Sequence, residues 1–116
     1  MTPAPLAVAD CERIHAGTIG QPVNAVSSLA YVGAGAALMA RARAHRLPAG
    51  ARGRLLAFGA TTAANGLGGL AYHGPGGAVS RWLHDAALLA TLGVVTVVYV
   101  EDLAGAGRQH AVVLAG

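Results

Sequence analysis

The chain has 116 residues, of which 54% are hydrophobic and only 11% carry a charge. Globular proteins average about 25% charged residues, so this composition excludes intrinsic disorder and an ordinary soluble domain and predicts a membrane protein. The net charge is +3, but all eight basic residues are Arg and the chain has one Phe to stack on bases. We therefore expect no nucleic acid partner.

The first predicted element is an apolar helix over residues 24–41. No charged residue lies between Arg13 and Arg41, and this stretch is rich in Ala, Leu, Val and Gly. About 20 residues suffice for a helix to cross the hydrocarbon core of a bilayer. Pro22 suits the first turn of such a helix. We expect this segment to be the first membrane span.

Two further spans are predicted after it. The second covers residues 55–73 and ends at the sequence HGPGG, whose Gly and Pro residues predict a turn. The third covers residues 82–100, with Trp82 and Tyr99 at its two ends, as is typical of aromatic residues at membrane interfaces. Because the turn is short, the second and third spans should be antiparallel.

A short Gly-rich loop is predicted over residues 101–110, and a fourth helix is expected to start near residue 111. Six residues remain there, too few to cross a membrane. We therefore expect residues 1–116 to form one all-α, polytopic transmembrane bundle that is incomplete at its C-terminus, as the first part of a longer protein. The alternative is a complete three-helix membrane protein.

The orientation in the membrane is predicted from the basic residues. Five of the eight Arg lie between positions 41 and 54. Loops rich in Arg and Lys stay in the cytoplasm. We therefore expect the 41–54 loop inside the cell, and the N-terminus and the HGPGG turn outside.

Polar residues at the outer ends of the spans are candidate functional groups. His73 ends the second span, and His84 and Asp85 begin the third, so the three should lie at one depth. Two His and one carboxylate can form part of a zinc site. Each also has a simpler interpretation: His73 as an interfacial side chain, and Asp85 as a favourable charge near a helix N-terminus.

Two further polar groups precede or begin the first span. Asp10 and Glu12 flank Cys11 and can hold a divalent cation or form a plain acidic turn. A polar stripe in the outer half of the span is suited to catalysis or to hydrogen bonding between helices, and it comprises Asn24, Ser27, Ser28 and Tyr31.

Four short motifs, in the order DCE, QPVNAVSSLAYV, AYHG and WLHD, carry a resemblance to a known family. The chain resembles the N-terminal half of the alkaline ceramidases and their bacterial relatives. These belong to the CREST group of seven-helix membrane hydrolases, which also includes the progestin and adipoQ receptors. The resemblance covers about residues 10–100.

The resemblance implies roles for individual residues. His73 matches the first zinc-binding His of the family, and Asp85 matches the Asp that holds or activates the zinc-bound water. Ser27 matches the start of the first helix and is a candidate catalytic residue. Asp10 and Glu12 match part of a calcium site beside the zinc.

The chain also departs from the family pattern. Gly69 stands where the family has a Ser one turn before the zinc-binding His, so Ser27, Ser28 or Thr62 would have to supply that hydroxyl. Gln21 stands where the family has an acidic calcium ligand. Two of the family's three zinc-binding His come from an HxxxH pair on the last helix, which residues 1–116 do not include.

These observations predict the N-terminal part of a zinc-dependent hydrolase that cleaves an amide bond in a membrane lipid, such as ceramide or another N-acyl lipid. We expect it in a bacterial plasma membrane and do not expect residues 1–116 to be active alone. The alternatives are a non-catalytic sensor or scaffold of the same fold and a small three-helix structural membrane protein.

Overall fold

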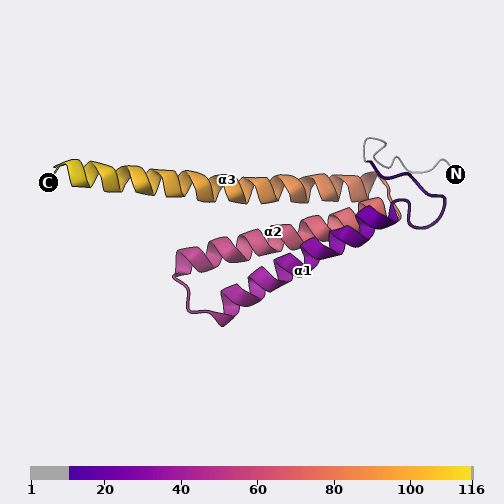
Figure 1. Ribbon diagram of the computed structural model, residues 1–116, viewed down its shortest axis with the longest axis horizontal. Helices are drawn as coiled ribbons and strands as arrows, with labels where there is room; N and C mark the ends of the chain where they lie inside the picture. Colours follow the sequence, from indigo (N-terminus) through magenta and orange to yellow (C-terminus); the bar gives the residue numbers. More distant parts are fainter. Residues whose placement is uncertain (1–10, 116) are drawn as a thin grey trace.

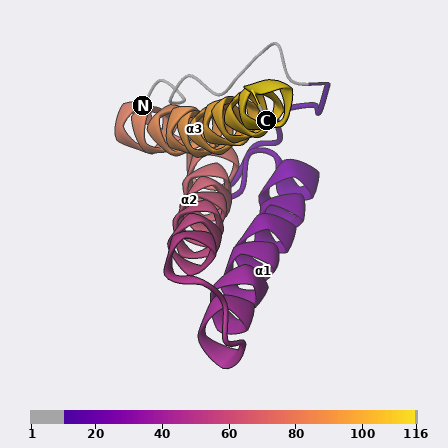
Figure 2. The same ribbon diagram turned by 90° about the vertical axis from the view of Figure 1, so that its left-hand side faces the viewer.

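The computed structural model describes residues 11–115, and it describes side chains for residues 11–105. These residues form three α-helices and no strand: α1 (Pro22–Ala44), α2 (Ala49–His73) and α3 (Ala78–Ala115). α1 and α2 form an antiparallel hairpin, and α3 runs back along α2 (Figure 1). α2 contacts both other helices, whereas α1 and α3 make no contact within the described residues (Figure 2). The predicted all-α fold is confirmed.

The ends of α1 follow from its sequence. Pro22 is the first helical residue, as predicted, because its fixed φ suits that position and its missing N–H costs no helical hydrogen bond. Arg41 and Arg43 lie in the last turn, where positive charge interacts favourably with the helix dipole. The helix ends at His45, whose backbone is extended, and the nearby Pro48 precedes α2.

A four-residue turn connects α2 to α3. Gly74 follows the last residue of α2 and donates its N–H to the carbonyl of Leu70, which closes the helix. Gly76 and Gly77 have φ values of 74° and 114°, a region that L side chains disfavour. The predicted turn at HGPGG is therefore confirmed, and its glycines allow the chain to reverse within a few residues.

α3 is longer than predicted. The helix runs without interruption through residues 101–110, where a loop was expected, and through residue 111, where a separate helix was expected. Its 38 residues correspond to about 57 Å, well beyond the roughly 30 Å of a bilayer core. Each Gly inside a helix costs only about 1 kcal/mol of helix stability relative to Ala. The glycines of this segment therefore lower the stability of α3 without ending it.

Small residues allow the helices to approach closely. A Cβ atom on Gly35 would meet the backbone carbonyl of Gly59 and the backbone of Ala63. A Cβ on Gly66 would lie 2.7 Å from the carbonyl of Ser28. Close contact through small residues is typical of helices packed in lipid. In contrast, a Cβ atom on Gly33 would face open space.

Two helical segments in the described part of the chain are long and apolar enough to cross a membrane: Pro22–Ala44 and Ala78–Gly105. α2, the second expected span, is long enough with 25 residues but is not among them. Its sequence contains Arg52, Arg54 and Asn65 as well as many glycines, which lower its hydropathy.

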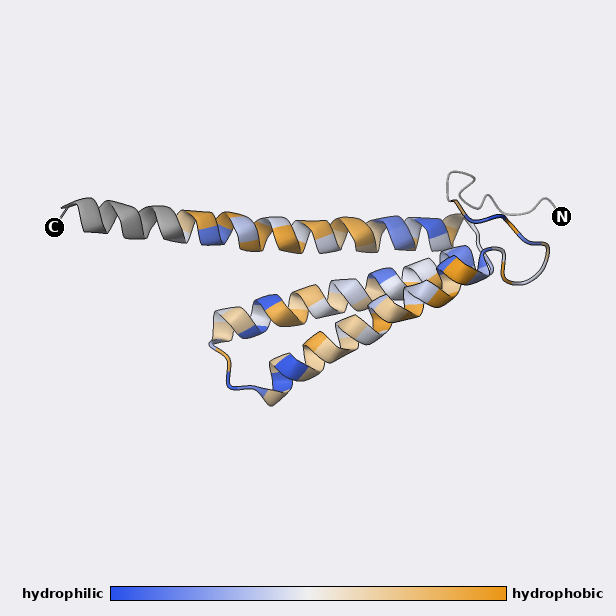
Figure 3. Cartoon of the chain, viewed as in Figure 1, coloured by the Kyte–Doolittle hydropathy of each residue, from blue (hydrophilic) through white to orange (hydrophobic). Residues whose placement is uncertain are grey.

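The surface of the two apolar helices is exposed. Only 17% of the most apolar window of α1 and 6% of that of α3 are buried, whereas the core helix of a soluble protein would be mostly buried. Figure 3 shows hydrophobic residues along the described length of α3. Large exposed apolar surfaces are rare on soluble monomers. The two helices therefore indicate a membrane location, with lipid or further helices covering these faces.

Candidate functional site

The start of α1, the end of α2 and the start of α3 meet at one end of the molecule (Figure 1). Two backbone hydrogen bonds join the residues just before α1 to the end of α2. The N–H of Gly20 donates to the carbonyl of Gly74 at 2.9 Å, and the N–H of Gln21 donates to the carbonyl of His73 at 2.8 Å. Residues far apart in the sequence are thereby fixed beside the α2–α3 turn.

Glu12 caps α1 from a distance. Its two carboxylate oxygens accept the backbone N–H groups of Val23 and Asn24 at 2.8 and 2.7 Å. The residue that precedes the helix, Gln21, makes no such bond with its own side chain. The first N–H groups of a helix have no partner within the helix, and negative charge is favourable there. Glu12 therefore stabilises the start of α1. Asp10, its expected calcium-binding partner, lies outside the described residues.

The buried side chain of Gln21 connects this cap to His73. Its Nε2 donates to the carbonyl of Glu12 at 3.3 Å, and its Oε1 lies 2.6 Å from Nδ1 of His73. Because the amide oxygen only accepts, His73 must donate this bond from Nδ1. The lone pair of the ring is then on Nε2. A hydrogen bond to one ring nitrogen is how proteins orient a metal-binding His and select its tautomer.

His73 and His84 lie next to each other. Their ring centroids are 5.6 Å apart in an edge-to-face arrangement, and the buried Tyr72 contacts both rings. The end of α2 and the start of α3 therefore lie close together, as expected. The residue of α3 that contacts His73 is His84.

Asp85 lies on another side of α3. Its carboxylate is 3.7 Å from the guanidinium of Arg81 on the same helix, and its side chain is 56% exposed. Successive side chains on a helix diverge by about 100°, which separates Asp85 from the face of His84. Among the described residues, no three His, Cys, Asp or Glu side chains come close enough to share a metal ion.

The polar stripe on α1 divides into exposed and buried parts. Ser27, the candidate catalytic residue, is exposed, and its hydroxyl donates to the carbonyl of Asn24 at 3.0 Å. Ser28 is buried and donates to the same carbonyl at 2.8 Å. Ser28 and His84 were candidate functional groups in the sequence, whereas the contact between Gln21 and His73 was not predicted.

Ser28 occupies the space beside Gly69. A Cβ atom on Gly69 would lie 2.7 Å from Oγ of Ser28 and 3.6 Å from Nδ1 of His84. A side chain at position 69 would therefore clash with Ser28. The hydroxyl of Ser28, which comes from the neighbouring helix α1, thus occupies the space that a side chain at position 69 would take.

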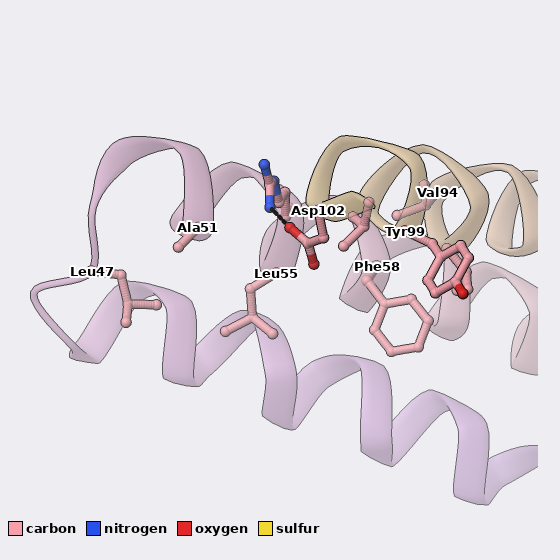
Figure 4. A pocket seen from close by; sticks show the side chains of 10 residues that line it. Leu47, Ala51, Leu55, Phe58, Val94, Tyr99 and Asp102 are labelled. Carbon is pink, nitrogen blue, oxygen red and sulfur yellow. Dashed lines mark hydrogen bonds and ion pairs between the residues drawn. The ribbon is translucent and has the colours of Figure 1, made fainter. Parts of the chain in front are cut away.

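A second feature lies toward the other end of the molecule, between α2 and α3. An apolar groove of about 600 Å³ is lined by residues such as Leu55 and Phe58 of α2 and Val94 of α3 (Figure 4). Arg54 pairs at its edge with Glu101 at 2.7 Å and with Asp102 at 3.1 Å. The two acids therefore connect α3 to α2.

The fold and the site therefore define an all-helical protein with two helices suited to crossing a membrane and a polar cluster at one end. Neither a protein-family model, nor a curated protein, nor a solved structure matches the chain.

Proposed function

We propose that this chain is part of a membrane-embedded, zinc-dependent hydrolase that resembles the ceramidases and cleaves an amide bond in a lipid. The observation that carries the proposal is the hydrogen bond between Gln21 and Nδ1 of His73 at 2.6 Å. It sets the tautomer and the ring orientation that a zinc-binding His needs. The two membrane-length apolar helices support a substrate drawn from the bilayer.

The described residues fit a partial zinc site. His73 supplies one imidazole, while a catalytic zinc usually takes three protein ligands and a water. The ligands that complete the set would come from outside the described residues. When bound, a zinc ion supplies Lewis-acid polarisation of the amide carbonyl and an activated water.

The remaining roles belong to side chains near this end of the bundle. Asp85 would accept the proton of the attacking water and return it to the leaving amine, as a general base and then a general acid. Its exposed carboxylate is suited to contact with water. Ser27 or the buried Ser28 would orient the lipid amide through a hydroxyl.

The proposal is tested with the purified full-length protein in lipid nanodiscs that contain ceramide or another N-acyl lipid. Wild type should contain zinc and release fatty acid, and His73→Ala should lose both. His45→Ala is the matched control, because His45 is exposed and lies at the other end of α1. Equal zinc content and equal hydrolysis in wild type and His73→Ala would contradict the proposal.

The proposal includes a bacterial plasma membrane location with the N-terminus outside and the Arg-rich residues 41–54 inside. The chain offers its own probe, because Cys11 is its single cysteine and is exposed. A membrane-impermeant thiol reagent should label Cys11 in intact cells. Labelling of Cys11 only after lysis, with labelling of Ala51→Cys in a Cys11→Ser background showing the reverse pattern, would contradict this orientation.

Calcium at Asp10 and Glu12 is also part of the proposal. Each carboxylate oxygen has two lone pairs, so Glu12 can cap α1 and still accept a cation. Added calcium should raise the melting temperature of wild type and not that of Asp10→Asn, whose α1 cap is intact. An equal response of both proteins would exclude a role for Asp10.

A non-catalytic scaffold or sensor of the same fold is the second candidate. The packing of Gly69 against Ser28 favours it, because Ser28 is already engaged with the carbonyl of Asn24. This candidate predicts folded protein in nanodiscs that releases no fatty acid from any N-acyl lipid, with or without zinc.

A further inference from the structure

Both the backbone and the ring of His84 contact α2. The backbone of His84 packs so closely on α2 that a Cβ atom on Gly68 would lie 2.8 Å from its Cα. The Tyr72 ring stacks on the His84 ring, with centroids 5.8 Å apart and planes inclined by 20°. α2 therefore contacts the backbone of His84 at Gly68 and its imidazole at Tyr72.

One atom of this ring has no partner in the described part of the chain. Nδ1 of His84 is buried and makes no hydrogen bond to any described residue. Stacking on Tyr72 does not satisfy a ring nitrogen, and buried side-chain nitrogens are nearly always hydrogen-bonded or bound to a ligand. The side-chain carbonyl oxygen of Asn65 is likewise buried without a hydrogen-bond partner among the described residues. Asn65 lies one turn before Gly69, which faces Nδ1 of His84.

The two imidazoles have a spacing that suits a shared ion. Zinc binds imidazole nitrogen at about 2.0–2.1 Å, so two imidazoles on one tetrahedral ion have ring centres about 5 Å apart. The centroids of His73 and His84 are 5.6 Å apart. The separation of the two rings is therefore close to that of two imidazoles on one ion.

We infer that His84 is a second metal-binding residue, so that His73 of α2 and His84 of α3 bind one zinc ion together. The inference deepens the proposed function in its metal site and does not depend on the hydrolytic reaction. Imidazole suits zinc and its neighbours in the first transition series, and the buried Nδ1 of His84 gains the partner that it lacks among the described residues. Asp85 lies on another side of α3, beside Arg81, and is not part of this pair.

The test is a titration of the purified full-length protein in detergent micelles with Co²⁺, whose visible absorption reports the ligands of a zinc-type site. His84→Gln should weaken Co²⁺ binding at least about tenfold, because loss of even an outer-shell partner of a metal-binding His costs about 10–100-fold in affinity. His45→Gln, which changes an exposed His, should bind as wild type does. Circular dichroism establishes that both variants are folded.

A second variant keeps the inference testable if His84→Gln does not fold. His84→Cys in a Cys11→Ser background places a thiolate, itself a good ligand for these ions, at the proposed position. Bound Co²⁺ should then show a thiolate-to-metal charge-transfer band in the near ultraviolet. A Co²⁺ complex without that band would overturn the inference.

The outcomes separate this inference from the proposed function. Loss of metal from His73→Gln but not from His84→Gln would overturn the inference and leave the zinc-dependent hydrolase standing. Metal binding that needs both His, in a protein that cleaves no lipid amide, would support the inference and contradict the proposed function. Absence of any Co²⁺ or Zn²⁺ binding by wild type would overturn both.

Discussion

Replacement of Gln21 by Leu tests how the proposed zinc site orients His73. The Gln21 side chain is fully buried, and its Oε1 lies 2.6 Å from Nδ1 of His73. Loss of such an outer-shell partner costs about 10–100-fold in metal affinity, which corresponds to about 1.4–2.8 kcal/mol. Removal of an acceptor from a buried donor also costs about 1–3 kcal/mol of folding stability.

The assay is competition for Zn²⁺ against a chromophoric chelator, with thermal unfolding measured in the same detergent. Gln21→Leu should weaken zinc binding about 10–100-fold. Gln21→Glu separates the two bonds of this side chain: its carboxylate still accepts the Nδ1–H bond and should keep the zinc affinity near that of wild type, while it loses the donor to the carbonyl of Glu12. Wild-type zinc affinity in a folded Gln21→Leu protein would refute the reasoning.

The packing, the helix cap and the replaced hydroxyl each give a further prediction. Gly35→Ala should lower the free energy of unfolding by about 1–3 kcal/mol through overpacking, whereas Gly33→Ala should raise it by up to about 1 kcal/mol, because only the first meets α2. Thermal unfolding that ranks the pair in the opposite order would exclude this helix contact. Glu12→Ala should lower the free energy of unfolding by about 0.5–2 kcal/mol, as loss of a helix cap does. Amide hydrogen exchange in the first turn of α1 should become faster, and unchanged exchange there would contradict the cap. Gly69→Ser should destabilise the protein, and Ser28→Ala should recover part of that loss, with a coupling of about 0.5–3 kcal/mol in a double-mutant cycle. Additive effects of the two changes would show that the side chains do not compete for the same space.

The fold was predicted from the sequence where a local signal decides the structure. Pro22 marked the start of α1, and the glycines of HGPGG marked the turn after His73, because both act through backbone conformation. The end of α3 was not predicted. Its acidic residues and glycines look like a loop in sequence, but the acids pair with Arg54 of α2, a contact that spans 48 positions for Asp102.

The site was predicted in part for the same reason. The short turn required the start of α3 to lie beside His73, but which residue faces it depends on helix rotation, and the structure selects His84. The bond between Gln21 and His73 joins residues 52 positions apart, and Glu12 caps a helix that begins ten residues later. No local pattern indicates such contacts, because they depend on the path of residues 11–20.

The central claim is that His73 binds the zinc ion that supports cleavage of a lipid amide. The most direct measurement is fatty acid release by the full-length protein from an N-acyl lipid in nanodiscs, first after complete removal of metal and then after addition of one equivalent of Zn²⁺. The account predicts no release without metal, recovery in wild type on addition of zinc, and no recovery in His73→Ala. Release that persists without metal, or that recovers equally in His73→Ala, would contradict it.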